Sequence, residues 1–356
     1  MAVGFPVKAD YITGDVLTAN NMNDLSGTLN TIQSVEYAAG KNKIINGDFG
    51  VWQRGTSFSN NTTGDVYTAD RWVSQVNGTG TRTITQQTFT AGTAPVAGYE
   101  GTFFLRMGCS SSGTSTYFNI KQKIENVRTF AGQTVTVSFW AKASASLTTN
   151  FFGLTQDFGS GGSTAVDTAG TNLTFTTSYV RYTQTFTIPS ISGKTIGTGS
   201  NLALAISFGS GTFTSFDIWG VQVEASSTAS DFQTATGTLQ GELAACQRYY
   251  VRYSSTDVFH SYANGMTTST TVGYVTVPLP VEMRTAPTTL DTSTVTKLET
   301  YNSLASNKVL SAIAIDRPST KAFSLVCTIT GATNGQVITL RNSNDATAFF
   351  GVSAEL

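Results

Sequence analysis

The sequence predicts a mainly β protein in which a short N-terminal helix precedes two β-sandwich domains. Only 12% of the 356 residues are charged, about half of the usual ~25%, and Thr, Ser and Gly take their place. Hydrophobic and polar residues alternate over many short segments. Gly/Ser/Thr-rich loops separate these segments and no helical pattern lies between them, which argues against a βαβ fold. Such strands and loops are typical of a sandwich or jelly roll.

Residues 1–42 are predicted to form an extended arm followed by a short helix. Its apolar residues are spaced three, four and three positions apart, as in a short coiled coil; they are Met22, Leu25, Leu29 and Ile32. The stripe covers less than two heptads, and an isolated helix this short is marginal in water. Two interpretations stay open: a parallel bundle of identical chains, or a single helix packed on its own domain.

Residues 43–240 are predicted to form the first sandwich, because period-two alternation begins near Lys43. Within 215–224 we expect Asp217, Trp219, Val221 and Val223 to share one face of a strand. The predicted strands are 82–90, 102–108, 117–124, 135–141, 179–188, 202–208 and 215–224.

Residues 241–356 are predicted to form a second β domain, since about 110 residues suit one small sandwich. The alternation is lost near 230–245 and resumes in a strand from Cys246. Three prolines around Met283 indicate an edge or a corner. The predicted strands are 246–254, 270–279, 308–314, 321–330, 335–342 and 346–353.

Charge and cysteine usage exclude several partner classes. The net charge is -1, from 21 basic and 22 acidic residues, and no basic run marks a nucleic-acid site. No stretch reaches the ~18 apolar residues of a membrane span, so no membrane insertion is expected. Cys109, Cys246 and Cys327 lie far apart without metal-binding spacing, so we expect buried free thiols.

No catalytic residue is predicted, because nucleophile–base and metal motifs are missing. The single histidine, His260, lies in a polar stretch without a neighbouring nucleophile. A hydrolase would need two facing carboxylates. Asp65, Asp70, Asp157 and Asp167 are available, but no spacing singles out a pair.

Tryptophans are the candidate sugar contacts, because sugar rings stack on exposed aromatic faces. Trp52 and Trp72 follow turn residues and are expected near a rim, with Arg54 beside them. Trp140 and Trp219 lie in the strongest strand patterns and are expected in the core.

Several segments carry a family resemblance. INGDFGVWQRGTSF, YTADRW, TVTVSFWAKA and FDIWGVQVEASSTASDF resemble carbohydrate-binding-module-like jelly rolls of bacteriophage tail fibre and other virion fibre proteins. ELAACQRYY with VPLPVEMRTAPT is similar to the segment that follows that module in phage structural proteins. GDVLTANNMNDLSGTLNTI resembles their virion-attachment segment.

This resemblance implies a homotrimer with a galactose-binding-like jelly roll over about 43–235. Residues 1–40 would dock on another virion protein, a baseplate, tail or neck component, with the C-terminal domain outward. The family often holds a structural calcium near the first strand with an acid in the last. Asp48 and Asp217 occupy comparable places, whereas Gly50 replaces the family's usual acid. No other cofactor is implied.

The predicted function is therefore that of a non-enzymatic phage fibre protein. It would be made in the bacterial cytoplasm, assemble as a homotrimer on the virion, and contact polysaccharide on the host surface. Two alternatives stay open: a neck or head fibre decoration that binds no glycan, and a polysaccharide depolymerase.

Overall fold

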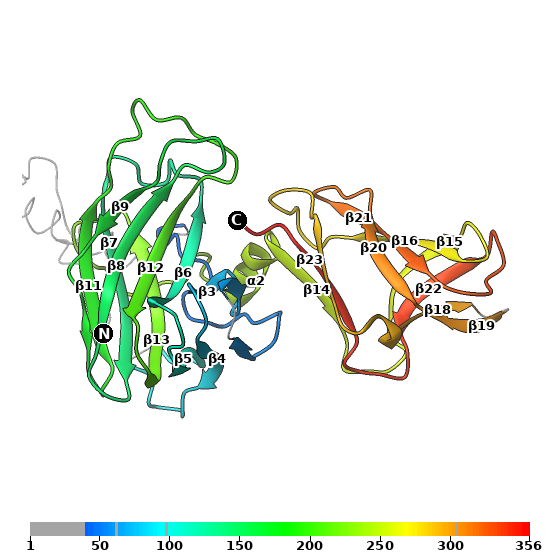
Figure 1. Cartoon of the computed structure of the whole chain (residues 1–356), viewed down its shortest axis with the longest axis horizontal. Helices are drawn as coiled ribbons and strands as arrows, with labels where there is room; N and C mark the ends of the chain where they lie inside the picture. The colour runs from blue at the N-terminus through cyan, green and yellow to red at the C-terminus, as the bar shows by residue number, and fades with distance from the viewer. Residues whose placement is uncertain (1–39, 61–62, 97–98, 303–304) are drawn as a thin grey trace, which may run out of the picture.

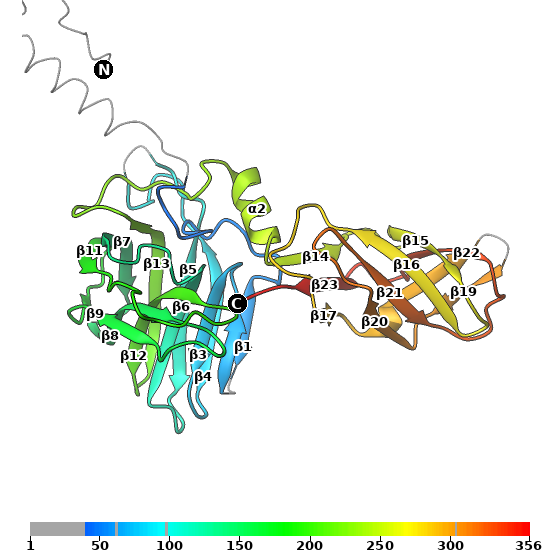
Figure 2. The ribbon, with the colours of Figure 1, turned by 90° about the horizontal axis from the view of Figure 1, so that it is seen from above.

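The computed structural model describes residues 40–60, 63–96, 99–302 and 305–356. The predicted N-terminal helix, with Met22, Leu25, Leu29 and Ile32, lies outside these residues. The described chain folds into two β-sandwiches that lie side by side, with helix α2 (Leu239–Gln247) between them (Figures 1 and 2). The mainly β prediction is confirmed.

The first sandwich consists of two antiparallel sheets. One sheet has the order β1-β4-β5-β13-β7-β11, and the other has the order β10-β8-β12-β6-β3-β2, with β9 paired to β8. The strands are β1 (Ser57–Asn60), β2 (Gly64–Tyr67), β3 (Trp72–Val76), β4 (Thr81–Thr88), β5 (Phe103–Ser111), β6 (Tyr117–Glu125), β7 (Thr134–Ala143), β8 (Leu147–Asp157), β9 (Val166–Ala169), β10 (Thr174–Phe175), β11 (Val180–Thr187), β12 (Asn201–Gly209) and β13 (Phe213–Glu224).

The core between these sheets follows from strand alternation. In β7 every second side chain points inward, as predicted: Val135, Val137, Phe139 and Ala141 are all buried. Leu202, Leu204, Ile206 and Phe208 of β12 meet them from the opposite sheet. Burying apolar side chains of this size stabilises a fold by about 1.5–3 kcal/mol each, so this core holds the sandwich together.

Strand β13 departs from the predicted alternation. Val221 and Val223 lie in the core, whereas Trp219 packs in a separate cluster and Asp217 pairs with neighbouring strands. The pairing with β7 shifts register after Trp219, and Gly220 has φ +66°. This β-bulge inserts one residue and turns the following side chains to the other face. The prediction that all four share one face is therefore wrong.

The second sandwich has a three-stranded sheet, β14-β23-β17, and a seven-stranded sheet, β19-β18-β22-β15-β16-β21-β20. A second core lies between them and includes Val277, Leu325 and Phe350. The strands are β14 (Tyr250–Ser254), β15 (Ser261–Thr267), β16 (Val272–Pro278), β17 (Thr289–Thr292), β18 (Leu298–Asn302), β19 (Ala305–Val309), β20 (Ala312–Asp316), β21 (Ala322–Thr328), β22 (Val337–Asn342) and β23 (Phe349–Ser353); the short 3₁₀ helix η1 (Val295–Lys297) precedes β18.

Helix α2 corrects the predicted strand from Cys246. The hydroxyl of Thr238 caps the helix by accepting a hydrogen bond from Gly241 N at 3.0 Å. The buried Glu242 on α2 accepts from Asn46 N at 2.7 Å and from Thr236 N at 2.7 Å. The helix is therefore tied to the first sandwich, and the strands of the second begin only at Tyr250.

Other segments also differ from the predicted strands: β1, β2, β3, β9, β10, β17 and β18 were not predicted, and three further differences have a clear cause in the sequence. β8 was not predicted, because polar Thr, Asn and Gln residues and Gly153 interrupt its hydrophobic pattern. The predicted strand 308–314 is divided between two strands: β19 ends just before the buried Leu310, and β20 begins after it. β15 was also missed, since its sequence SYANGMT carries few apolar residues.

Candidate functional site

The outer face of the six-stranded sheet has two ends of different character. At one end Phe104, Trp140 and Trp219 form an aromatic cluster, which Phe89 and Phe232 cover. The rings of Trp219 and Phe232 are 4.9 Å apart, and those of Trp140 and Trp219 are 5.5 Å apart. These tryptophans are core residues, as predicted, although their cluster is separate from the inter-sheet core.

Next to this cluster, toward the other end, lies a polar row, defined as Thr85, Arg106, Asp217, Lys142 and Tyr179. The Tyr179 ring also packs against the cluster, 5.7 Å from the Phe89 ring. Arg106 lies opposite Thr85 on one side and Asp217 on the other, and Asp217 lies opposite Lys142. The guanidinium of Arg106 donates to both carboxylate oxygens of Asp217, at 2.6 and 2.8 Å. The ammonium of Lys142 is 3.9 Å from the same carboxylate and 4.8 Å from the Tyr179 ring centroid. The row is thus a fixed array of donors and acceptors.

Burial and charge shape the chemistry of the row. Burial, together with the nearby Asp217 carboxylate, raises the pKa of Tyr179. Its hydroxyl is buried without a hydrogen-bond partner among the described residues. Hydrogen bonding to Asp217 raises the pKa of Arg106 further above its ordinary value. Both groups keep their protons at neutral pH, so they remain hydrogen-bond donors.

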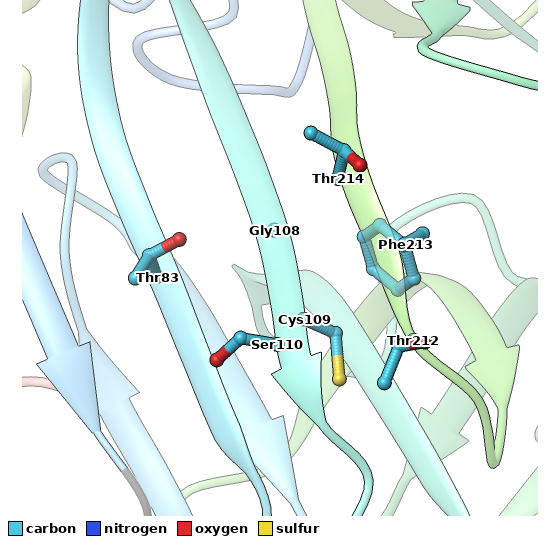
Figure 3. Close-up of a pocket in the computed structure, with 7 residues that line it drawn as sticks. All are labelled: Thr83, Gly108, Cys109, Ser110, Thr212, Phe213 and Thr214. Atoms are coloured by element: carbon cyan, nitrogen blue, oxygen red, sulfur yellow. The ribbon is translucent and has the colours of Figure 1, made fainter.

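A groove of about 390 Å³ continues the row toward the end of the sheet. We call it the hydroxyl groove. Figure 3 shows Thr83 on one strand, Gly108 and Ser110 on the next, and Thr214 on the third. Its remaining lining residues are Cys109, Thr212 and Phe213.

Gly108 forms the floor of the hydroxyl groove. A Cβ atom at Gly108 would lie 2.8 Å from the carbonyl oxygen of Thr214 and 3.0 Å from Oγ1 of Thr83. Only glycine lets these two oxygens converge. The register of β13 against β5 shifts between Phe213 and Phe216, which brings the Thr214 backbone over the floor.

The groove and the polar row together suit an uncharged, hydroxyl-rich ligand. Thr83, Ser110, Thr212 and Thr214 are exposed, and each hydroxyl both donates and accepts hydrogen bonds. Arg106, Lys142 and Asp217 together carry a net charge of +1, and both cations are paired with the Asp217 carboxylate. Beneath the groove, burial raises the pKa of the Cys109 thiol, so it is not a nucleophile at neutral pH.

All three cysteines are buried free thiols, as predicted.

Of the two tryptophans predicted at a rim, Trp72 is not a sugar platform, and the role predicted for Trp52 stays a prediction. Trp72 is 0% exposed, and its indole donates to Asn46 O at 2.9 Å. The prediction that Trp72 lies near a rim is wrong, because its ring fills the core beside Phe49. Trp52 is partly buried, donates to Phe49 O at 2.7 Å and packs against Phe58.

Arg54 lies in the joint between the two sandwiches. Its guanidinium stacks 3.5 Å from the Tyr250 ring centroid and is 3.3 Å from Glu355. Glu355 also pairs with the buried Arg71, whose guanidinium lies 3.4 Å from the Tyr249 ring centroid. The side chain of Arg54 is only 11% exposed. It therefore ties the sandwiches together, and the predicted sugar contact is wrong for this residue.

Further contacts hold the same joint. Gln53 donates through its side-chain amide to Tyr250 O at 2.8 Å, and Arg252 donates to Gln53 O at 3.2 Å. Glu125 of β6 accepts from Tyr249 Oη at 2.8 Å and from Arg248 at 3.2 Å. Figures 1 and 2 show the joint between α2, β14 and the first sandwich.

The structure does not bring Asp48 and Asp217 together as ligands of one calcium ion. Asp217 is already neutralised by Arg106 and Lys142. Asp48 lines a different cleft, of about 430 Å³, beside Gly50 and Glu242. Glu242 already accepts three hydrogen bonds, so the converging free oxygens of a calcium site are not present there. Within the described ranges no group of three or more His, Cys, Asp or Glu residues is placed to hold a metal.

The acids considered for hydrolysis lie in separate surroundings. Asp70 is buried and accepts from Gln53 N at 2.9 Å. Asp65 pairs with Lys121 at 3.0 Å, while Asp167 accepts from Thr155 Oγ1 at 2.6 Å. Asp157 accepts from Gly159 N at 2.9 Å. These contacts give each acid a structural role.

Sequence reasoning missed the hydroxyl groove, although one cue was present. Gly108 interrupts an otherwise regular strand, and such a glycine often marks a bulge or a close backbone approach. The partners Thr83 and Thr214 lie far from it in the chain, so no local pattern could have named them.

No described helix is long and apolar enough to cross a membrane.

Parts of this chain are similar to solved structures of carbohydrate-binding modules. A family 11 carbohydrate-binding module from Clostridium thermocellum, in complex with a β-1,3-1,4-mixed-linked tetrasaccharide, is 8% identical; the match covers 48% of this chain and 96% of that one, with a TM-score of 0.31. The C-terminal family 22 carbohydrate-binding module of Clostridium thermocellum Xyn10B is 19% identical, with 49% and 96% covered and a TM-score of 0.32.

A tailspike domain also appears among the similar structures. The enzymatically active domain of bacteriophage CBA120 tailspike protein 4 is 15% identical, with a TM-score of 0.31; the match covers 52% of this chain but only 21% of the tailspike chain. No protein-family model and no curated protein matches this sequence.

Proposed function

We propose that this chain is a non-enzymatic structural protein of a bacteriophage fibre that binds polysaccharide on the host surface. The ordered sequence resemblance and the low-charge, hydroxyl-rich composition support the fibre assignment. The proposal includes a homotrimer assembled through the predicted helix within residues 1–42 and docked through residues 1–40 on another virion protein. The polysaccharide would bind on the outer face of the six-stranded sheet.

One observation carries the proposal of a sugar site: the polar end of that face is open, whereas its aromatic end is covered. Thr83, Ser110 and Thr214 present hydroxyls and a carbonyl around the Gly108 floor. Arg106 and Lys142, partly exposed, present fixed N–H donors beside them. Sugar hydroxyls need such a mixture of donors and acceptors in a shallow groove.

Binding at this site would be weak for one sugar and stronger for a polymer. A net hydrogen bond contributes only about 0.5–1.5 kcal/mol, and the groove offers few apolar surfaces. Three copies in a homotrimer would bind a repeating polysaccharide together and gain avidity. This need for multivalency fits a trimeric fibre.

The test is affinity electrophoresis of the full chain in native gels that contain one purified polysaccharide each. The panel comprises mixed-linkage β-glucan, xylan, mannan, dextran and lipopolysaccharide. We expect at least one polymer to retard the wild type. The double variant Thr83→Ala/Ser110→Ala should weaken retardation by about five- to tenfold, because two hydrogen-bonding groups are lost.

The matched control is Thr183→Ala, which removes an exposed hydroxyl from β11 of the same sheet, outside the groove. It should bind like the wild type. Equal retardation of the double variant and the wild type would place the sugar elsewhere. New reducing ends after incubation with the polymer would contradict the non-enzymatic proposal.

A further inference from the structure

Two aromatic side chains stand out on the second sandwich. Among the Phe, Tyr and Trp residues that the structure describes, only Phe259 and Tyr301 are strongly exposed, at 43% and 39%. Exposed aromatic rings are the surfaces on which sugars stack. In this protein they are therefore on the second sandwich, away from the hydroxyl groove.

Both rings stack on the same side chain. The guanidinium of Arg341 lies 4.9 Å from the Phe259 ring centroid and 4.2 Å from that of Tyr301. Arg341 is on β22 and Tyr301 is on the neighbouring β18, which Figure 1 shows side by side. Phe259 comes from the loop before β15. Three separate segments thus bring two rings to one cation.

The cation is neutralised within the cluster. Arg341 Nε donates to Glu299 at 2.7 Å, and a terminal nitrogen of Arg341 is also 2.7 Å from that carboxylate. Glu299 is buried and lies directly opposite Arg341 in the sheet. The cluster therefore offers apolar rings and N–H donors without a net charge.

The fold holds Phe259 in an unfavourable backbone conformation. Its φ is +58°, in the left-handed region that bulky residues rarely adopt. The buried Asn342 fixes the loop, since its side chain donates to Asp257 O at 2.6 Å and accepts from His260 N. Phe259 N donates to Ser343 O at 3.3 Å. Strain of this kind collects at binding sites, where it orients a side chain.

We propose that Phe259, Arg341 and Tyr301 form a second sugar-binding platform, which takes an uncharged pyranose. The apolar face of the sugar ring stacks on the aromatic rings, and its hydroxyls accept hydrogen bonds from the guanidinium. An acidic sugar is disfavoured because Glu299 already satisfies Arg341 and would repel a second carboxylate. The sugar class rests on the proposed function, but the location of the platform does not.

The experiment uses the full chain in affinity gels with mixed-linkage β-glucan, mannan, dextran and xylan as neutral probes. Alginate serves as an acidic probe. We expect a neutral polymer to retard the wild type, with binding about tenfold weaker in Tyr301→Ala. Tyr301→Phe, which keeps the ring, should bind within twofold of the wild type, as should Val180→Ala at an exposed apolar position on β11 of the first sandwich.

Phe259→Gly separates binding from stability. Glycine relieves the positive φ, so the melting temperature should not fall, while retardation should weaken as in Tyr301→Ala. A lower melting temperature with unchanged binding would show that the ring is merely structural and overturn the proposal.

Three other outcomes also overturn it. One is a wild type that no neutral polymer retards, and another is stronger binding to alginate. The third is a change of molecular mass in Tyr301→Ala, which would identify the surface as a protein contact. Loss of binding only in Thr83→Ala/Ser110→Ala would leave the hydroxyl groove as the site and exclude the platform, so failure of either site is distinguishable.

Discussion

Asp48 is a carboxyl group that the fold places beside another acid. Burial raises its pKa, and the nearby Glu242 carboxylate raises it further. The hydrogen bond from Gly50 N to the Asp48 carboxylate lowers this pKa only a little, because it is long, at 3.4 Å. An acid whose folded pKa is raised destabilises the folded state when it is ionised.

The sign of its pH dependence follows from linkage. Below the unfolded pKa of about 3.9 both states are protonated, so no stability is lost. As the pH rises from there through the raised folded pKa, the unfolded state loses its proton more readily and stability falls. At neutral pH the loss is complete.

Asp48→Asn should therefore raise the melting temperature at pH 7, by about 1–3 °C. The difference from the wild type should vanish below about pH 4. Differential scanning calorimetry over a pH series measures both. Asp257→Asn, at an exposed position, is the control and should change little. A calcium-dependent rise in the wild-type melting temperature that Asp48→Asn abolishes would show instead that Asp48 binds a cation.

At the scale of single elements, β13 shows how one glycine redirects a strand. The alternation in SFDIWGVQVE predicts one continuous face. Gly220 adopts φ +66° and the bulge there moves Trp219 and Asp217 to the outer face, while Val221 turns inward. The glycine was visible in the sequence, but its conformation depends on pairing with β7.

The N-terminal stripe is the element that the homotrimer proposal depends on. Leu25→Asp/Leu29→Asp places charges on the apolar side of the predicted helix, and burying them would be strongly unfavourable. We expect the wild type to sediment at three times the chain mass of 37.7 kDa and the variant at the chain mass. Thr28→Asp, which is off the stripe, should remain trimeric. A wild type that sediments as a monomer at micromolar concentration contradicts the proposal.

For the whole molecule, the joint between the sandwiches is a buried charge cluster. Glu355 accepts from both Arg54 and Arg71, and each guanidinium also stacks on a tyrosine ring. A carboxylate between two buried cations is costly to remove, because the cations would be left unpaired. The two sandwiches are therefore held as one unit.

Glu355→Gln should separate the sandwiches without unfolding them. Losing one partner of a buried ion pair costs about 3–5 kcal/mol, and here that loss falls on the joint. We expect small-angle scattering to show a broader range of inter-domain distances and trypsin to cut faster near Arg248. Glu282→Gln, at an exposed position, is the control. Unchanged scattering and proteolysis would mean that Gln53 and Glu125 hold the joint on their own.

Alternation and composition were enough to predict the β class, the two sandwiches, the buried cysteines and the inward face of β7. These features depend on local alternation and composition, which the chain carries directly. It also predicted Trp140 and Trp219 in the interior, because their strands have the clearest patterns.

The positions of the two proposed sites depend on contacts between distant segments of the chain. The hydroxyl groove needs Thr83, Gly108 and Thr214 from three strands, and the aromatic platform needs Phe259, Tyr301 and Arg341 from three segments. Arg54 and Trp72 were predicted at the surface. Arg54 instead lies in the joint between the sandwiches, and Trp72 lies in the core. The physical reason is that exposure and partnership arise from long-range strand pairing, which local periodicity does not encode.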